Sequence, residues 1–185
     1  MKYLLPIIAV FCVACQNKKD MIVTEPIVKK DSIKAETLDP PKINETLAKD
    51  WLKSNIEAYF KTENDYDKAT QAMQAMTTKD YYEYKTDATN VDMDIDGTLT
   101  KAEFEKKWKS KFDTKKAGIE SGFLISGQDW KEIKVTKWDI IGQKNDTLIF
   151  DVNIRDVGFN ENYPRVIKVK ADDGKFLIAD VLEDE

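Results

Sequence analysis

Residues 148–155 read L-I-F-D-V-N-I-R, and this short stretch decides the fold. Leu148, Phe150, Val152 and Ile154 alternate with a second set of residues that is mostly polar. Successive side chains of a β-strand point to opposite faces of its sheet. The pattern therefore predicts a strand with one buried face and one face in water.

Three other stretches, 130–141, 163–171 and 176–182, have the same strand character. The first of them changes phase at Trp138 and Ile140, which predicts a bulge. Short runs rich in Asn, Asp and Gly separate the four stretches, as turns between neighbouring strands do. We therefore expect an antiparallel meander of about four strands.

The first half of the chain has apolar residues at helical spacing instead. Asn44 and Thr78 are suited to begin two helices, residues 66–76 form another, and residues 100–112 a fourth. The residues expected to give the first helix its apolar positions are Leu47, Trp51, Ile56, Tyr59 and Phe60. Helices followed by an antiparallel sheet predict an α+β domain over residues 43–185.

This layout resembles the NTF2-like fold, in which helices pack into a bent antiparallel sheet. The resemblance is architectural, covers residues 42–185 and rests on no motif. It implies a cone-shaped α+β domain. The fold serves both enzymes and binding proteins, so it does not select a function.

A defined chemistry is indicated by residues 92–103, which read D-M-D-I-D-G-T-L-T-K-A-E. They resemble an EF-hand calcium loop, because they match its pattern D-x-[DN]-x-[DN]-G-x₅-E at every fixed position. Calcium takes about 6–8 oxygen ligands, and Gly97 allows the sharp turn that such a loop needs. The resemblance implies a Ca²⁺ site with ligands from Asp92, Asp94, Asp96, Thr98, Thr100 and Glu103.

Two other interpretations of this loop remain open. The first is an acidic turn that is merely solvated. The second is a metal-dependent phosphatase, because residues 94–100 also resemble the D-x-D-G-T-[LV]-T motif of haloacid dehalogenases, which uses two aspartates beside Mg²⁺. That motif follows a buried parallel strand, whereas the residues that precede Asp94 are polar.

The N-terminus indicates where the protein is located. Lys2 precedes an apolar run that is too short to span a bilayer and ends at Cys15. Val13-Ala14-Cys15 resembles the end of a bacterial lipobox, although Cys12 stands where that motif usually has Leu. The resemblance implies a signal peptide over residues 1–14 and a lipid on Cys15, which would attach the protein to a membrane of the cell envelope.

Residues 15–42 are rich in lysine and contain Pro26, Pro40 and Pro41, which predicts a flexible tether. The whole chain has 29 basic and 34 acidic residues. Seven lysines and five acidic residues lie in residues 1–42, so the negative charge is concentrated in the domain. An acidic domain is a poor partner for nucleic acid.

The composition argues against catalysis. The chain has no histidine, and its two cysteines are both in the N-terminal segment, so the usual near-neutral base and a thiol nucleophile are absent from the domain. We therefore expect a non-catalytic calcium-binding lipoprotein of the cell envelope, with membrane contact through its lipid and calcium in a structural role. The alternative is a protein-binding module of the envelope, such as an inhibitor or immunity protein.

Overall fold

A computed structural model describes residues 43–62, 65–127 and 129–183. The expected signal peptide, the lipidation site Cys15 and the tether over 15–42 lie outside the described residues. All described residues belong to the compact unit Leu38–Glu185. The buried apolar core lies between Ala48 and Val181, so this unit has the core of an independently folding domain.

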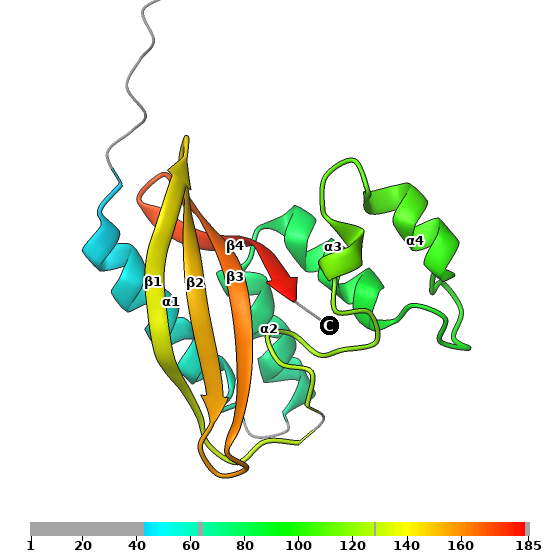
Figure 1. Ribbon diagram of the computed structural model, residues 1–185. Coiled ribbons are helices and arrows are strands. Elements are labelled where there is room, and N and C mark those ends of the chain that lie inside the picture. Colours follow the sequence, from blue (N-terminus) through cyan, green and yellow to red (C-terminus); the bar gives the residue numbers. More distant parts are fainter. Residues whose placement is uncertain (1–42, 63–64, 128, 184–185) are drawn as a thin grey trace, which may run out of the picture. The chain divides into compact units, whose positions relative to one another are not determined.

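The predicted α+β class is confirmed (Figure 1). Within the described residues, four helices and a short 3₁₀ turn precede four strands. The helical elements are α1 (Glu45–Tyr59), α2 (Tyr66–Met76), α3 (Lys79–Thr89), α4 (Lys101–Trp108) and η1 (Thr114–Lys116). The strands are β1 (Ile133–Lys144), β2 (Thr147–Asp156), β3 (Glu161–Asp172) and β4 (Lys175–Glu183).

The strands form one antiparallel sheet in the order β1-β2-β3-β4, so the predicted meander is also confirmed. Asn145 and Asn160 have positive φ angles of 53° and 61° in the first two turns, a conformation that Asn tolerates better than most residues. Two register shifts interrupt β1, between Val135 and Lys137 and between Ile140 and Gly142. They confirm the expected bulge in this strand.

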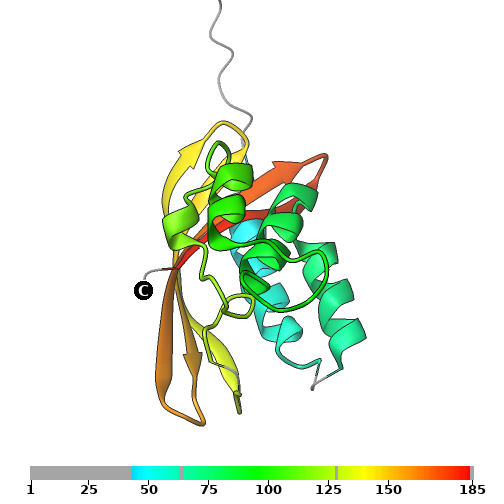
Figure 2. The ribbon, with the colours of Figure 1, turned by 90° about the vertical axis from the view of Figure 1, so that its right-hand side faces the viewer.

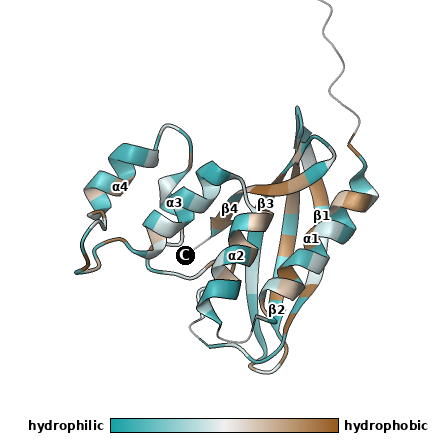
Figure 3. Ribbon diagram, turned by 180° about the vertical axis from the view of Figure 1, so that it is seen from behind, coloured by the Kyte–Doolittle hydropathy of each residue, from teal (hydrophilic) through white to brown (hydrophobic). Residues whose placement is uncertain are grey.

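The inner face of β2 is the centre of the core. Leu148, Phe150, Val152 and Ile154 are all fully buried, as the alternation predicts. Figure 2 shows α1 and α2 on one side of the sheet. In Figure 3 the apolar residues gather on the strands, whereas α4 is mostly hydrophilic.

Helix α1 corrects one expectation. Leu47, which we expected to face the core, is 57 % exposed, while Ala48, Leu52 and Ile56 are fully buried. These three residues are four positions apart and lie on one helix face. Trp51 lies at the edge of that face and is partly buried.

Helix α4 is shorter than expected, because it ends at Trp108 and not at Phe112. Asp113 accepts a hydrogen bond from Lys115 N (3.2 Å) and begins η1, so the chain must turn before it. Phe112 keeps its predicted packing role outside the helix, since its ring stacks on Tyr84 at 4.2 Å between centroids.

Candidate metal centre and the network that positions it

The residues of the predicted calcium loop connect α3 to α4. Helix α3 ends at Thr89, three residues before Asp92, and α4 begins at Lys101 with Thr100 as its N-cap. The second helix therefore starts at the tenth residue of the twelve. Gly97, the sixth residue, has φ of 90°, a backbone conformation that glycine adopts at little cost.

The two helices that flank the loop pack on each other through aromatic rings. Tyr84 of α3 stacks on Phe104 of α4 with 5.4 Å between ring centroids. The indole N–H of Trp108 donates a hydrogen bond to Asp87 Oδ2 (2.7 Å), and Lys107 forms an ion pair with the same oxygen (2.7 Å). These contacts fix the distance between the two ends of the loop.

The first loop residue closes the loop at its base. Asp92 has a positive φ of 56°, and its backbone N–H donates to Leu99 O (3.0 Å). One carboxylate oxygen of Asp92 accepts a hydrogen bond from Lys101 N at 3.4 Å. The Thr98 hydroxyl donates a hydrogen bond to Ile95 O within the loop (2.9 Å). Its backbone carbonyl, the expected ligand, makes no hydrogen bond with the described residues.

Thr100 and Glu103 form a capping box at the start of α4. Glu103 Oε2 accepts hydrogen bonds from Thr100 N (3.0 Å) and from Thr100 Oγ1 (2.7 Å). Both hydrogen bonds lower the pKa of the Glu103 carboxyl from its usual value, and the bond from the Thr100 hydroxyl is the larger cause. The carboxylate is therefore charged at neutral pH, and one of its two oxygens is already engaged by the protein.

Asp94 and Asp96 are exposed, and neither forms a hydrogen bond or an ion pair with a described residue. Within the described ranges, no group of three or more Asp, Glu, His or Cys residues is gathered tightly enough to hold a metal ion. Of the six predicted ligands, the structure thus brings Thr100 and Glu103 together and does not draw the four carboxylates to one point.

The strand that the phosphatase motif requires does not precede these residues. Asp94 follows α3 and a turn, and the described strands all pair antiparallel.

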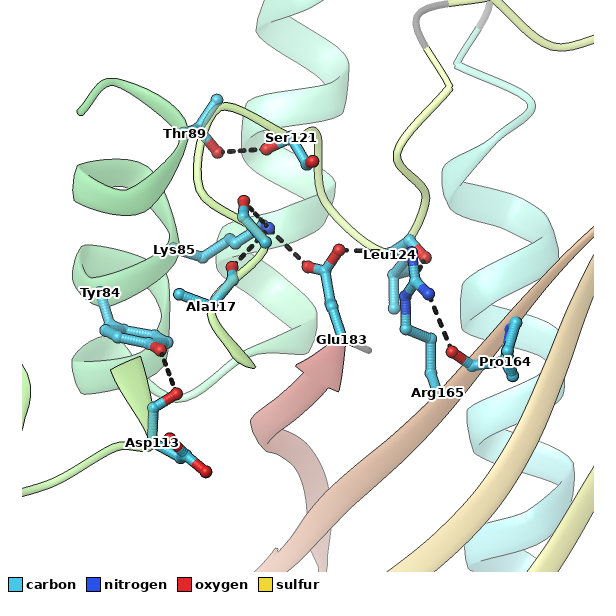
Figure 4. A network of polar contacts seen from close by, with 11 residues as sticks. Tyr84, Lys85, Thr89, Asp113, Ala117, Ser121, Leu124, Pro164, Arg165 and Glu183 are labelled. Carbon is cyan, nitrogen blue, oxygen red and sulfur yellow. Dashed lines mark hydrogen bonds and ion pairs between the residues drawn. The ribbon is translucent and has the colours of Figure 1, made fainter. Parts of the chain in front are cut away.

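A buried charged network, which the sequence reasoning missed, anchors α3 to the sheet (Figure 4). Lys85 of α3 is fully buried, and its Nζ lies 2.5 Å from Glu183 Oε1 at the end of β4. Arg165 of β3 approaches the other carboxylate oxygen of Glu183 at 3.3 Å and donates from Nε to Leu124 O (3.0 Å). We call Lys85, Arg165 and Glu183 the Lys85 network.

Lys85 is further satisfied by two backbone carbonyls of the segment between η1 and β1. Its Nζ donates to Ala117 O (2.9 Å) and Gly118 O (3.1 Å). Burial lowers the pKa of the Lys85 amine, and the neighbouring Glu183 carboxylate opposes that shift. Gly118 has a positive φ of 57°, and a Cβ at this position would overlap the Glu183 carboxyl group. The network therefore holds α3, β3, β4 and this segment together.

The sequence contains a signal for this burial. Tyr81, Tyr84, Lys85 and Ala88 have the i, i+3, i+4, i+7 spacing of one helix face, and all four are buried. A lysine on such a face needs a buried counter-charge. Tyr81 lies on the same helix face as Lys85. Among the described residues, its hydroxyl is the one buried side-chain polar atom without a hydrogen bond.

No helix in the described part of the chain is long and apolar enough to cross a membrane. Comparisons with protein-family models, with curated proteins and with solved structures find no match to this chain.

Proposed function

We propose that this protein is a lipid-anchored, non-catalytic component of a bacterial cell envelope that binds one calcium ion in residues 92–103. The observation that carries the proposal is the position of the helix boundaries around the loop. α3 ends before Asp92, α4 begins at the tenth loop residue, and Gly97 at the sixth has a positive φ. These boundaries support the helix–loop–helix arrangement that an EF-hand requires.

The donor set fits a hard cation. The loop offers carboxylate, hydroxyl and carbonyl oxygens and no nitrogen or sulfur ligand, which suits calcium better than zinc or copper. Asp92, Asp94 and Asp96 would each supply one carboxylate oxygen. Thr98 would supply its backbone carbonyl oxygen, and Thr100 would contact the ion directly or through a water molecule. The ion would neutralise carboxylates that otherwise repel one another.

Glu103 would both bind the ion and cap α4. Its Oε2 caps α4 through Thr100, as described above. A bidentate ligand uses both carboxylate oxygens, so calcium must compete with this capping interaction. We infer modest affinity in the range of about 10⁻⁴–10⁻³ M that is typical of extracellular calcium modules. Such a site would be filled in a calcium-rich envelope and would act structurally.

We also propose that the domain has an NTF2-like fold. The bulged antiparallel sheet with α1 and α2 on one side supports an NTF2-like architecture. The loop would then be an EF-hand-like insertion between two of its helices.

Thermal unfolding with and without calcium tests the calcium site. An ion that binds only the folded state stabilises it by about 2.7 kcal/mol at a hundredfold excess over Kd. The melting temperature should therefore rise with calcium and return to its starting value with a chelator. Magnesium should have little effect, because it requires tight octahedral geometry.

Glu103→Gln is the matching variant for this experiment. It removes the charge of the closing ligand and keeps a side chain that can still cap α4 through its amide oxygen. We expect most of the calcium-dependent shift to disappear, with little change in the melting temperature under chelator. An equal calcium shift in both proteins would contradict the assignment of Glu103.

Membrane attachment is tested at Cys15. Cys15→Ser should move the protein from the membrane fraction to the soluble fraction and remove the acyl mass from its N-terminus. Two or three acyl chains hold a protein on a bilayer far more firmly than one, because each buried CH₂ contributes about 0.8 kcal/mol. If both proteins fractionate alike and neither has an acyl group, the lipoprotein assignment is wrong.

A further inference from the structure

The region that begins at the end of the proposed calcium loop has the opposite charge to the rest of the domain. Residues 101–116 contain seven lysines and three acidic residues, whereas the whole chain has a net charge of −5. Two of these lysines are used internally, since Lys107 pairs with Asp87 (2.7 Å) and Lys111 with Asp80 (2.8 Å). Four others are exposed and form no ion pair with a described residue. They are Lys101, Lys106, Lys109 and Lys115.

These four lysines lie on α4 and its neighbour η1, but not on one face. Phe104 and Trp108 give α4 its buried face, and at 3.6 residues per turn Lys106 and Lys109 lie on the other side of the helix. Lys101, three residues before Phe104, lies on the side of the buried face instead, and it lines one open pocket of about 230 Å³ together with Lys115 and Glu105. We call Lys106 and Lys109, which point away from the core, the basic surface.

Two apolar side chains are exposed in the loop that leads into α4. Met93 and Ile95 are 46 % and 64 % exposed, and they alternate with the acidic residues of the loop. The loop leads directly into α4, and Figures 1 and 3 show both at the end of the domain away from β1. Apolar residues next to lysines are the composition of surfaces that insert into the headgroup region of a bilayer.

The loop carboxylates oppose such an insertion when no cation neutralises them. Asp92, Asp94 and Asp96 lie in the same segment as Met93 and Ile95 and would be repelled by anionic headgroups. One calcium ion would cancel two of these charges and so weaken that repulsion. Charges elsewhere on the acidic domain matter less, because salt screens them over about 8–10 Å.

We propose that calcium binding at residues 92–103 docks this end of the domain onto an anionic lipid bilayer. The lysines of the basic surface contact headgroup phosphates, and Met93 and Ile95 enter the interface between headgroups and acyl chains. This inference rests on the proposed calcium site. It adds a second, calcium-dependent attachment to a protein that the lipid on Cys15 already holds near the membrane, so the domain would lie against the bilayer only when calcium is present.

Sedimentation with lipid vesicles tests the inference on the compact unit Leu38–Glu185, which excludes the apolar run before Cys15. The vesicles contain phosphatidylcholine alone or mixed with phosphatidylglycerol, and each set is used with calcium and with a chelator. We expect binding to the anionic vesicles in calcium only. Since each lysine near such a surface contributes about fivefold in affinity, Lys106→Glu/Lys109→Glu should weaken binding by about thirtyfold or more.

Matched controls distinguish an effect of these residues from a general effect of net charge or of exposed apolar side chains. Lys61→Glu/Lys175→Glu makes the same charge change away from α4 and should leave binding within about twofold, because salt screens charges at that distance. Met93→Ser/Ile95→Ser should weaken binding by about tenfold or more, since it removes the side chains that would be buried. Ile141→Ser removes another exposed apolar residue, 59 % exposed in β1, and should have no effect.

Calcium uptake, measured by titration calorimetry on the same proteins, keeps the two proposals apart. Met93→Ser/Ile95→Ser should take up calcium as the unchanged protein does and should no longer bind anionic vesicles. That result would support docking. If the unchanged protein takes up calcium but does not bind anionic vesicles, docking is wrong and the calcium site stands. Equal binding to both kinds of vesicle, or equal loss in the variants and their controls, also overturns docking. If no calcium is taken up, both proposals fail.

Discussion

Two groups of acidic residues in this domain have opposite surroundings. Glu183 and Asp156 are buried, and cations or backbone N–H groups engage both oxygens of each carboxylate. Asp94 and Asp96 are exposed and have no partner among the described residues. A carboxylate that the fold already satisfies contributes to stability and has little capacity left for a ligand. A carboxylate that the fold leaves unpaired contributes little to stability and can bind a cation.

The largest effect is expected in the Lys85 network. Lys85→Ala removes a cation from beside Glu183 and leaves two carbonyls without their donor. Breaking a buried ion pair by removing one partner costs about 3–5 kcal/mol, and Glu183 then keeps Arg165 as its neighbouring cation. Urea unfolding should show a loss in this range.

Lys85→Met is the matched control for that variant. It also removes the charge and the hydrogen bonds of Lys85, but it leaves the Arg165–Glu183 pair in place and fills most of the space of the side chain. We expect its cost to be smaller than that of Lys85→Ala, since it leaves a smaller cavity. A cost below about 1 kcal/mol for Lys85→Ala would mean that the ion pair does not anchor α3, since that value is far under the usual cost of breaking a buried ion pair.

A somewhat smaller effect is expected at Asp156, at the end of β2. Its carboxylate accepts hydrogen bonds from the backbone N–H groups of Lys131 (2.9 Å), Glu132 (3.3 Å), Gly158 (2.8 Å) and Phe159 (3.2 Å). Asp156→Ala leaves these donors without an acceptor and should cost about 3 kcal/mol at neutral pH. Chemical denaturation measures this difference.

The Asp156 contribution should depend on pH in one direction. Burial, the largest single influence, raises the pKa of this carboxyl, but the four backbone donors together lower it more, so the net pKa is below its usual value. The contribution is therefore complete above the unfolded-state pKa of about 3.9. It is lost as the pH falls through the lower folded-state pKa. A stability difference between the two proteins that grows on acidification would contradict this assignment.

The smallest effect on stability is expected in the loop. Asp94→Asn/Asp96→Asn in the presence of chelator should change the free energy of unfolding by less than about 0.5 kcal/mol, as surface substitutions usually do. Removing two like charges from one turn acts in the stabilising direction. A loss above about 2 kcal/mol would place these aspartates with the structural group of Asp156 and Glu183.

The parts of the fold that depend on local pattern could be predicted from the sequence. Alternation along residues 148–155 identified the inner face of β2, and the side chains of Asn44, Thr78 and Thr100 cap the helices that begin after them. The sequence does not determine which face of α1 packs on the sheet, because Leu47 and Ala48 are neighbours and both are apolar. Only the packing against the sheet turns Ala48 inward and leaves Leu47 in water.

The long-range parts could not be predicted from the sequence. Lys85 and Glu183 are 98 residues apart in the chain, and no local pattern pairs them. The loop is intermediate between these cases. Its helix boundaries follow from its own residues, and the T-x-x-E sequence of Thr100 and Glu103 is the signature of the capping box that the structure contains. The sequence reasoning assigned Glu103 to the metal alone and overlooked this competing role.

Titration calorimetry of calcium into the chelator-treated protein, with Asp94→Asn/Asp96→Asn as the comparison, tests the central claim most directly. The account predicts uptake of one ion by the unchanged chain, with a Kd of about 10⁻⁴–10⁻³ M, and no uptake by the double variant. Absence of uptake by the unchanged chain at millimolar calcium would contradict the account. The unpaired carboxylates of residues 92–103 would then be an acidic turn in water.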